Sequence, residues 1–189
     1  MRSWSASRPT RTSRKKRKSI SRNEQPFALA LGGNLGPVEG NLRRAVAELA
    51  AALGPLGVAG LYRTRAITPD PQPPYLNTAV TGRTDLGAEA LLALAKRLER
   101  EAGRRPGPRF TARPLDIDLL LLGDLILDRP GLTVPHPRLA ERRFVLAPLA
   151  ELAADWRVPP RGETVAELLA RVGQEEDVER LAIIFPGFP

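Results

Sequence analysis

The sequence of 189 residues lacks cysteine and contains a single histidine, His136. Disulfide bonds and thiolate metal ligands are therefore excluded, and so is a zinc site of the Cys/His or multi-histidine type. Aromatic residues make up only 5% of the chain, and no apolar run is as long as a membrane-spanning helix. Because a chain without cysteine suits a reducing compartment, we expect a cytoplasmic protein that is not embedded in a membrane.

Lysine is nearly missing as well, since Lys96 is its one occurrence after residue 25. The sequence contains no Gly-x-x-x-x-Gly-Lys motif. A phosphate site built on lysine, as in P-loop proteins and protein kinases, is therefore nearly excluded. Arginine would have to bind any phosphate instead, and the planar fork of donors on its guanidinium group suits that role.

The net charge of +8 belongs to residues 1–25, which hold nine of the 29 basic residues and one of the 21 acidic residues. Residues 26–189 carry no net charge and are long enough to form one domain with a proper core. We expect the basic segment to be a disordered extension. It is a nucleic-acid-binding arm, a transit peptide or an extension without function. We favour the last, because the segment lacks an apolar face and a secretory h-region.

Hydrophobic periodicity predicts alternating strands and helices from Pro26 onward. The predicted strands cover residues 27–31, 58–64, 75–81 and 119–122, and the predicted helices cover residues 37–53, 91–102 and 164–172. Thr164 and Glu167 form a capping box at the start of the last helix. Residues 125–127 are expected to form a short hairpin partner of the strand at 119–122.

Asp116 and Asp118 precede the most apolar strand and are two residues apart. Because side chains alternate along a strand, both carboxylates point to the same side, with their backbones roughly 6–7 Å apart. Such carboxylates repel each other and lose hydration, and Mg²⁺ would remove both penalties while it shares substrate phosphates. The motif alone equally fits a strand that faces solvent. Four arginines just upstream favour a polyphosphate site: Arg104, Arg105, Arg109 and Arg113.

Three further features have both a functional and a structural interpretation. Tyr75 and Asn77 share one face of a strand and could stack on and hydrogen-bond a flat heterocycle, although a surface tyrosine with a capping asparagine is equally common. A lone histidine is more often structural, but His136 lies between two prolines beside several arginines, so we predict a phosphate contact. Glu99 and Lys96 lie off the apolar stripe of their helix and are expected to face solvent.

Several motifs occur in an order that resembles one family. They are Leu31-Gly32-Gly33-Asn34-Leu35-Gly36, Tyr75-Leu76-Asn77, Gly103-Arg104, Arg113-Pro114-Leu115-Asp116-Ile117-Asp118-Leu119, Val134-Pro135-His136-Pro137-Arg138, and Arg142 with Phe144-Val145-Leu146-Ala147-Pro148-Leu149. Across roughly residues 26–172 this set resembles 6-hydroxymethyl-7,8-dihydropterin pyrophosphokinase. The resemblance implies an α+β ferredoxin-like sandwich. It also implies transfer of pyrophosphate from ATP to the pterin hydroxymethyl group, with release of AMP and with two Mg²⁺, in tetrahydrofolate biosynthesis.

The resemblance implies a role for individual residues too. Asp116 and Asp118 would hold both metal ions, and Tyr75 and Phe144 would sandwich the pterin ring. The pterin edge would be bound by Asn77, Thr64 and the backbone near Ile67. The nucleotide set would be Arg104, Arg113, Thr133, His136 and Arg142, with Arg104 and Arg113 catalytic and with Glu99 and Leu119 near the nucleoside.

The sequence departs from the family pattern at Gly33, where serine is usual, and at Arg65 and Ala66 in the loop over the pterin. The segment before Arg113 also differs, so the second arginine of the catalytic loop is either Arg105 or Arg109. We expect a monomer that acts on small molecules and has no nucleic-acid or membrane partner.

Two other functions fit parts of the same sequence. A ferredoxin-like nucleic-acid-binding domain with a basic arm is the main alternative, but residues 26–189 are neutral and poor in aromatic residues on the predicted strands. A metal-dependent phosphohydrolase could use the same acids, and it would release free phosphate rather than AMP.

Overall fold

The computed structural model describes residues 24–66, 71–107, 111–173 and 177–181. The predicted basic extension lies almost entirely outside these residues, and the first strand already begins at Gln25. The helices are α1 (Val38–Leu53), α2 (Ala88–Glu101), α3 (Arg143–Ala153) and α4 (Val165–Arg171), with a short 3-10 helix η1 (Leu139–Glu141). None of the described helices combines the length and the hydropathy that a membrane crossing requires.

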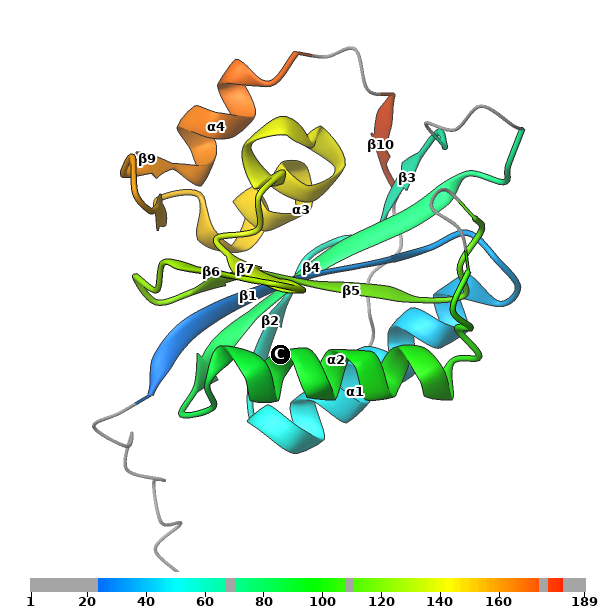
Figure 1. Ribbon diagram of the computed structural model, residues 1–189. Coiled ribbons are helices and arrows are strands. Elements are labelled where there is room, and N and C mark those ends of the chain that lie inside the picture. The colour runs from blue at the N-terminus through cyan, green and yellow to red at the C-terminus, as the bar shows by residue number, and fades with distance from the viewer. Residues whose placement is uncertain (1–23, 67–70, 108–110, 174–176, 182–189) are drawn as a thin grey trace, which may run out of the picture.

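The main sheet is antiparallel, and helices cover both of its faces, with α1 and α2 on one side and α3 and α4 on the other (Figure 1). Its strands are β1 (Gln25–Gly33), β2 (Leu56–Val58), β3 (Tyr62–Thr64), β4 (Tyr75–Thr84), β5 (Asp116–Leu122) and β10 (Val178–Arg180). Two small hairpins add β6 (Leu127–Arg129) with β7 (Leu132–Val134), and β8 (Arg157–Val158) with β9 (Glu163–Thr164). This arrangement confirms the predicted α+β ferredoxin-like sandwich.

Two local predictions about strands were wrong. The predicted strand at 58–64 is split into β2 and β3, because the amide of Gly60 donates to the carboxylate of Glu151 on α3 instead of to a neighbouring strand (2.8 Å). Residues 125–127 do not pair with β5, since β6 pairs with β7 instead. The chain turns away at Gly123, which has a φ of 52° and whose amide donates to the carbonyl of Pro26 at the start of β1 (2.7 Å).

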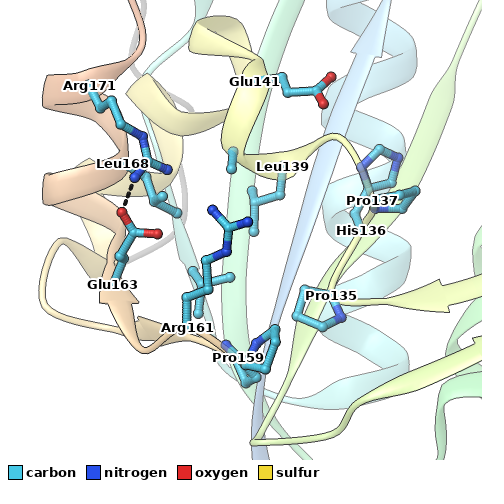
Figure 2. Close-up of a pocket in the computed structure, with 13 residues that line it drawn as sticks. Pro135, His136, Pro137, Leu139, Glu141, Pro159, Arg161, Glu163, Leu168 and Arg171 are labelled. Carbon is cyan, nitrogen blue, oxygen red and sulfur yellow. Dashed lines mark hydrogen bonds and ion pairs between the residues drawn. The ribbon is translucent and has the colours of Figure 1, made fainter.

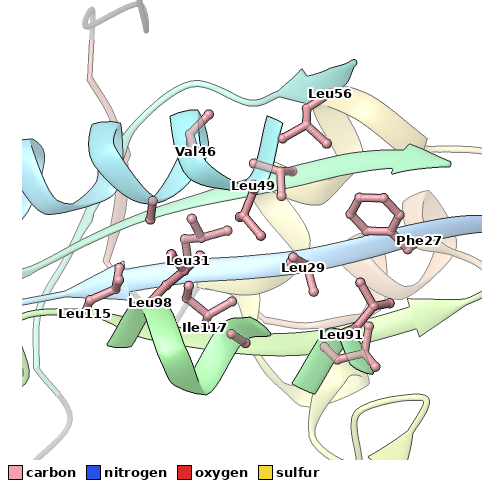
Figure 3. Packing of buried hydrophobic residues seen from close by; sticks show 14 of the residues in the cluster. Phe27, Leu29, Leu31, Val46, Leu49, Leu56, Leu91, Leu98, Leu115 and Ile117 are labelled. Atoms are coloured by element: carbon pink, nitrogen blue, oxygen red, sulfur yellow. The ribbon is translucent and has the colours of Figure 1, made fainter. Parts of the chain in front are cut away.

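The core has two halves of different character, one on each face of the sheet. Along β1, Phe27, Leu29 and Leu31 point toward α1 and α2 and pack there with leucines and valines (Figure 3). Ala28 lies in the other half, with α3 and α4, and Ala30 packs against it. Because side chains alternate along a strand, large residues fill the first face and small ones the second. The small residues let α3 lie close to the sheet, and Arg142 at its N-cap reaches Asp118 near the start of β5.

Residues at the start of α4 form the predicted capping box. The hydroxyl of Thr164 accepts a hydrogen bond from the amide of Glu167, and the Glu167 carboxylate accepts one from the amide of Thr164 (3.1 and 2.7 Å). Backbone donors in the first turn of a helix have no partner within the helix, so these side-chain contacts stabilise a helix of only seven residues.

We predict that Thr164→Ala lowers the free energy of unfolding by about 1 kcal/mol, because the substitution removes this cap. Chemical denaturation of the variant and of Thr164→Ser, which keeps the hydroxyl, measures the effect. Equal stability of the alanine variant and the wild type would show that α4 does not depend on its capping box.

Candidate active site

One end of the main sheet gathers most of the predicted site residues. The register of β1 with its neighbours places Gly32 opposite Asn77 of β4 on one side and opposite Asp116 of β5 on the other. Ala30 is opposite Asp118 in the same way. The acid pair and the predicted pterin-binding asparagine therefore lie on the two strands that flank β1, with Gly32 of β1 between them.

The two aspartates share one face of β5, as predicted, since the intervening Ile117 is buried and both aspartates are partly exposed. Arginine side chains contact Asp116 on both oxygens: Nη1 of Arg104 lies 2.5 Å from Oδ1, and Nη1 of Arg113 lies 2.8 Å from Oδ2. Asp118 has looser partners. Its Oδ2 lies 3.8 Å from Nε2 of His136 and 3.9 Å from Nη1 of Arg142.

Electrostatics distinguish the two acids. Burial and the adjacent charge of Asp116 raise the pKa of Asp118. Burial also favours the neutral form of Asp116, but the guanidinium groups of Arg104 and Arg113 outweigh it and lower the pKa of Asp116. Burial lowers the pKa of His136, so its imidazole gives Asp118 little positive charge. Asp118 is thus the less well neutralised acid of the pair.

Glu99 lies beneath this end of β5 rather than in solvent, so the prediction of a solvated face was wrong for it. Its side chain is 2% exposed, and it accepts a hydrogen bond from the amide of Ile117 (2.9 Å). Lys96 and Arg104 approach its carboxylate to 2.9 and 2.5 Å. Burial raises the pKa of Glu99, against the opposing effect of these donors. Glu99 therefore fixes Arg104, which contacts Asp116 with the same Nη1 atom.

The donor set of the acid pair fits a magnesium ion. Among the described residues no group of three or more His, Cys, Asp or Glu side chains is placed to hold a metal. Asp116 and Asp118 thus supply two carboxylates and no closed protein cage. Mg²⁺ is usually bound in this way, through one or two carboxylates together with substrate phosphates and water.

The predicted pterin-binding residues lie beside the acids. The Asn77 amide donates to the hydroxyl of Thr64 on β3 (2.9 Å), and both side chains are 6% exposed. Tyr75 lies opposite Thr64 in the strand pair and is partly exposed. Phe144 extends from the first turn of α3, with the guanidinium carbon of Arg142 5.5 Å from the centre of its ring. Arg142 thus connects the predicted stacking ring with Asp118.

Three other predicted residues have side chains that contact other groups or face solvent. The hydroxyl of Thr133 donates to Asp128 within the β6–β7 hairpin (3.0 Å). The side chain of Leu119 is 5% exposed and packs in the core on the α1 and α2 face, so it is not presented to a ligand. Arg105 is exposed to solvent. Ile67 and Arg109 lie outside the described residues, and the structure does not test their predicted roles.

Sequence reasoning assigned no role to two buried asparagines that hold the loop before β5. Asn34 and Arg113 exchange hydrogen bonds: the Asn34 amide donates to the Arg113 carbonyl, and the Arg113 amide donates to the Asn34 side chain (2.8 and 2.9 Å). Asn34 also donates to Gln72 in the proline-rich loop (3.1 Å), and Asn41 of α1 donates to the Pro114 carbonyl (3.1 Å). The signal available in the sequence was that polar residues stand at positions expected to face the core, which would have indicated a structural role for them.

A separate groove of about 640 Å³ lies behind His136 (Figure 2). It is lined mainly by prolines and leucines of residues 135–140, by the β8–β9 hairpin and by α4, with Arg171 and Glu163 paired at one side. His136 is the one predicted site residue among its lining residues. Neither Asp116 nor Asp118 lines the groove, which adjoins the acid pair through His136.

Comparison with known proteins identifies the family. The model of the 7,8-dihydro-6-hydroxymethylpterin-pyrophosphokinase family matches residues 28–154. The 2-amino-4-hydroxy-6-hydroxymethyldihydropteridine pyrophosphokinase of Synechocystis is 44% identical over 147 residues, which are 76% of this chain and 74% of that protein. This chain belongs to the 7,8-dihydro-6-hydroxymethylpterin-pyrophosphokinase family.

More distant relatives agree with this assignment. The mitochondrial folate synthesis bifunctional protein of Arabidopsis thaliana is 40% identical over 136 residues, or 70% of this chain, which spans 24% of that longer protein. A Plasmodium falciparum HPPK-DHPS structure superposes with a TM-score of 0.61 at 13% identity, over 78% of this chain and 43% of that one. At that identity the superposition supports the fold alone.

The structure shows what a side chain at residue 33, where the resemblance leads us to expect serine, would contact. A Cβ atom at Gly33 would lie 2.8 Å from the Pro114 carbonyl oxygen and 3.2 Å from that of Arg113. Both contacts are with backbone atoms of the loop that carries Arg113, so a side chain at residue 33 would push this loop away from β1.

We predict that Gly33→Ser lowers the free energy of unfolding by about 1–3 kcal/mol, the usual cost of overpacking a tight site, and that it weakens activity by displacing Arg113. Gly40→Ser on α1 is the matched control, since a Cβ there has no heavy atom within 4 Å. Chemical denaturation and a rate measurement on both variants test this. Full stability of Gly33→Ser would show that the loop adapts to the extra atoms.

Proposed function

We propose that the site at the end of β5 transfers the pyrophosphoryl group of ATP to the hydroxymethyl oxygen of 6-hydroxymethyl-7,8-dihydropterin. As a member of its family, the chain is an ATP-dependent pyrophosphokinase of folate biosynthesis. The observation that supports this site best is the placement of the Asp116–Asp118 pair beside Asn77 across Gly32. The charged groups that would bind a polyphosphate with its metal ions therefore lie close to the asparagine that would bind a heterocycle.

Asp116 and Asp118 would hold two Mg²⁺ ions, and the number two remains a prediction from the family resemblance. When bound, such ions neutralise phosphate charge and polarise the phosphoryl oxygens. The chain supplies two further groups to each acid: Arg104 and Arg113 at Asp116, and His136 and Arg142 at Asp118. These groups lie where the phosphates of ATP would meet the acid pair, so they are well placed to bind them.

The transfer step requires positioning more than covalent chemistry from the protein. The pterin hydroxymethyl oxygen forms a bond to the β-phosphorus of ATP, the bond from that phosphorus to the oxygen shared with the α-phosphate breaks, AMP leaves with that oxygen, and the hydroxyl proton is released. The protein needs no nucleophile of its own for this exchange. Arg104 and Arg113 would stabilise the charge that develops on the transferred group, since both already point to the same carboxylate.

The pterin would lie between Tyr75 and Phe144, with its edge against Asn77 and Thr64. Support comes from the partial exposure of Tyr75 and Phe144 and from the buried Asn77–Thr64 hydrogen bond, which orients the amide. Orientation of the ring brings its hydroxymethyl oxygen toward the acids and lowers the entropy cost of the reaction. Cytoplasmic localisation and a monomeric state remain predictions. The lack of cysteine favours a cytoplasmic localisation.

We predict that Asp116→Asn lowers the rate of AMP formation by at least about a thousandfold, because stabilisation by a bound metal contributes several kcal/mol. Asp124→Asn is the matched control, since Asp124 is an exposed aspartate just beyond the other end of β5. The assay quantifies AMP and pterin diphosphate with ATP, Mg²⁺ and the hydroxymethyl-dihydropterin. Free phosphate as the product, or an active Asp116→Asn variant, would contradict the proposal.

A further inference from the structure

Glu151, two turns into α3, binds three groups near the edge of the sheet opposite β5. Its Oε1 accepts hydrogen bonds from the hydroxyl of Tyr62 on β3 (2.6 Å) and from Nε of Arg180 on β10 (2.5 Å). Its Oε2 accepts one from the amide of Gly60 (2.8 Å). Figure 1 shows β10 beside β3, with α3 on the face of the sheet opposite α1 and α2. One carboxylate thus connects a helix with two strands.

The tyrosine of this cluster lies next to the residues predicted to bind the pterin. Tyr75, Asn77 and Thr64 on one side and Phe144 on the other form what we call the pterin slot. Tyr62 is 7% exposed and lies directly opposite Asn77 in the β3–β4 pair. Thr64, two residues along β3, accepts the hydrogen bond of the Asn77 amide. Directly opposed residues of an antiparallel pair share a face, so Tyr62, Thr64 and Asn77 all face the side that α3 covers.

The helix of this cluster carries the other wall of the slot. Phe144 and Glu151 are seven residues apart on α3, which is close to two full turns, and therefore lie on nearly the same side of the helix. The two predicted stacking rings come from different elements, Tyr75 from β4 and Phe144 from α3. The distance between the rings depends on how α3 is held against β3 and β4.

We propose that Glu151 is a positioning residue for the pterin, which it serves by fixing α3 to β3 through Tyr62. The inference rests on the proposed function of the site and adds a group that touches neither substrate. Glu151 holds the Phe144 wall at a set distance from the Tyr75 and Asn77 wall. Arg180 belongs to the same unit, because its guanidinium lies over Gly60 and balances the charge of Glu151.

The chemistry of the cluster suits a rigid connection. Burial and the hydrogen bond to Glu151 raise the pKa of Tyr62 to about 12, so the phenol keeps its donor proton at neutral pH. Burial favours the neutral form of Glu151, but its bonds to Arg180, Gly60 and Tyr62 outweigh this and lower its pKa. The pair is therefore a phenol donor and a carboxylate acceptor, and hydrogen bonds to a charged acceptor are among the stronger ones.

The test compares Tyr62→Phe, which deletes one hydroxyl, with the wild type in steady-state kinetics. We expect the KM for the hydroxymethyl-dihydropterin to rise about three- to tenfold, the effect of losing one aromatic stacking contact, while the KM for ATP stays within about twofold. Glu151→Gln should shift the same parameter in the same direction. The double variant should resemble each single variant, because both substitutions break one connection.

Thr164→Ala is the matched control, since it removes a hydrogen bond from α4 without touching this cluster. It should lose stability and leave both KM values unchanged. Unchanged pterin KM in Tyr62→Phe and Glu151→Gln, or an equal rise in both KM values, would overturn the inference. AMP formation by the wild type tests the proposed function separately: if it is absent, both statements fail, and if it is present, the KM comparison alone decides this one.

Discussion

Two carboxylates on one face of a buried strand are the constraint on which the rest of this site depends. Asp116 and Asp118 begin β5, whose remaining residues are apolar and buried. Negative charge at the end of such a strand is costly, because each ion loses hydration and repels the other. The protein offsets this cost with cations drawn from two places: the loop after α2, which carries Arg104 and Arg113, and the start of α3, where Arg142 lies.

The same cations explain how the fold can hold a polyphosphate. Arg104 is fixed by the buried Glu99, and Arg113 is fixed by Asn34 through its backbone, so neither arginine depends on Asp116 alone for its position. Rigid donors aimed at a site of developing charge are what phosphoryl transfer requires of a protein. The near absence of lysine outside residues 1–25 is thus consistent with a site in which arginine binds phosphate.

Much of this arrangement could be predicted from the sequence. The alternation of β5 placed Asp116 and Asp118 on one face, and the helical periods gave α1, α2 and α4 within a few residues. The ordered motifs gave the family and the fold. The match to the family model confirmed the family, and the antiparallel sheet with helices packed on it confirmed the fold. Gly33 was noticed only as a departure from the family pattern, and its cause emerged with the close approach of the Pro114 carbonyl.

Contacts between distant segments could not be predicted in this way. The apolar stripe of α2 indicated that Glu99 faces solvent, because a single helix does not reveal that a strand end with an unpaired amide lies against it. The split between β2 and β3 depends on Glu151, about ninety residues away in the chain. Asn34 joins two loops that are both remote from it in sequence. Each of these contacts is a long-range hydrogen bond, which the local spacing of apolar residues cannot predict.

The measurement that tests this account most directly is a crystal structure with a non-hydrolysable ATP analogue, the hydroxymethyl-dihydropterin and Mn²⁺ in place of Mg²⁺. The account predicts anomalous density for manganese at Asp116 and Asp118 and a pterin ring between Tyr75 and Phe144, with its edge on Asn77. Manganese bound elsewhere, or a pterin ring outside the slot formed by β4 and α3, would contradict it.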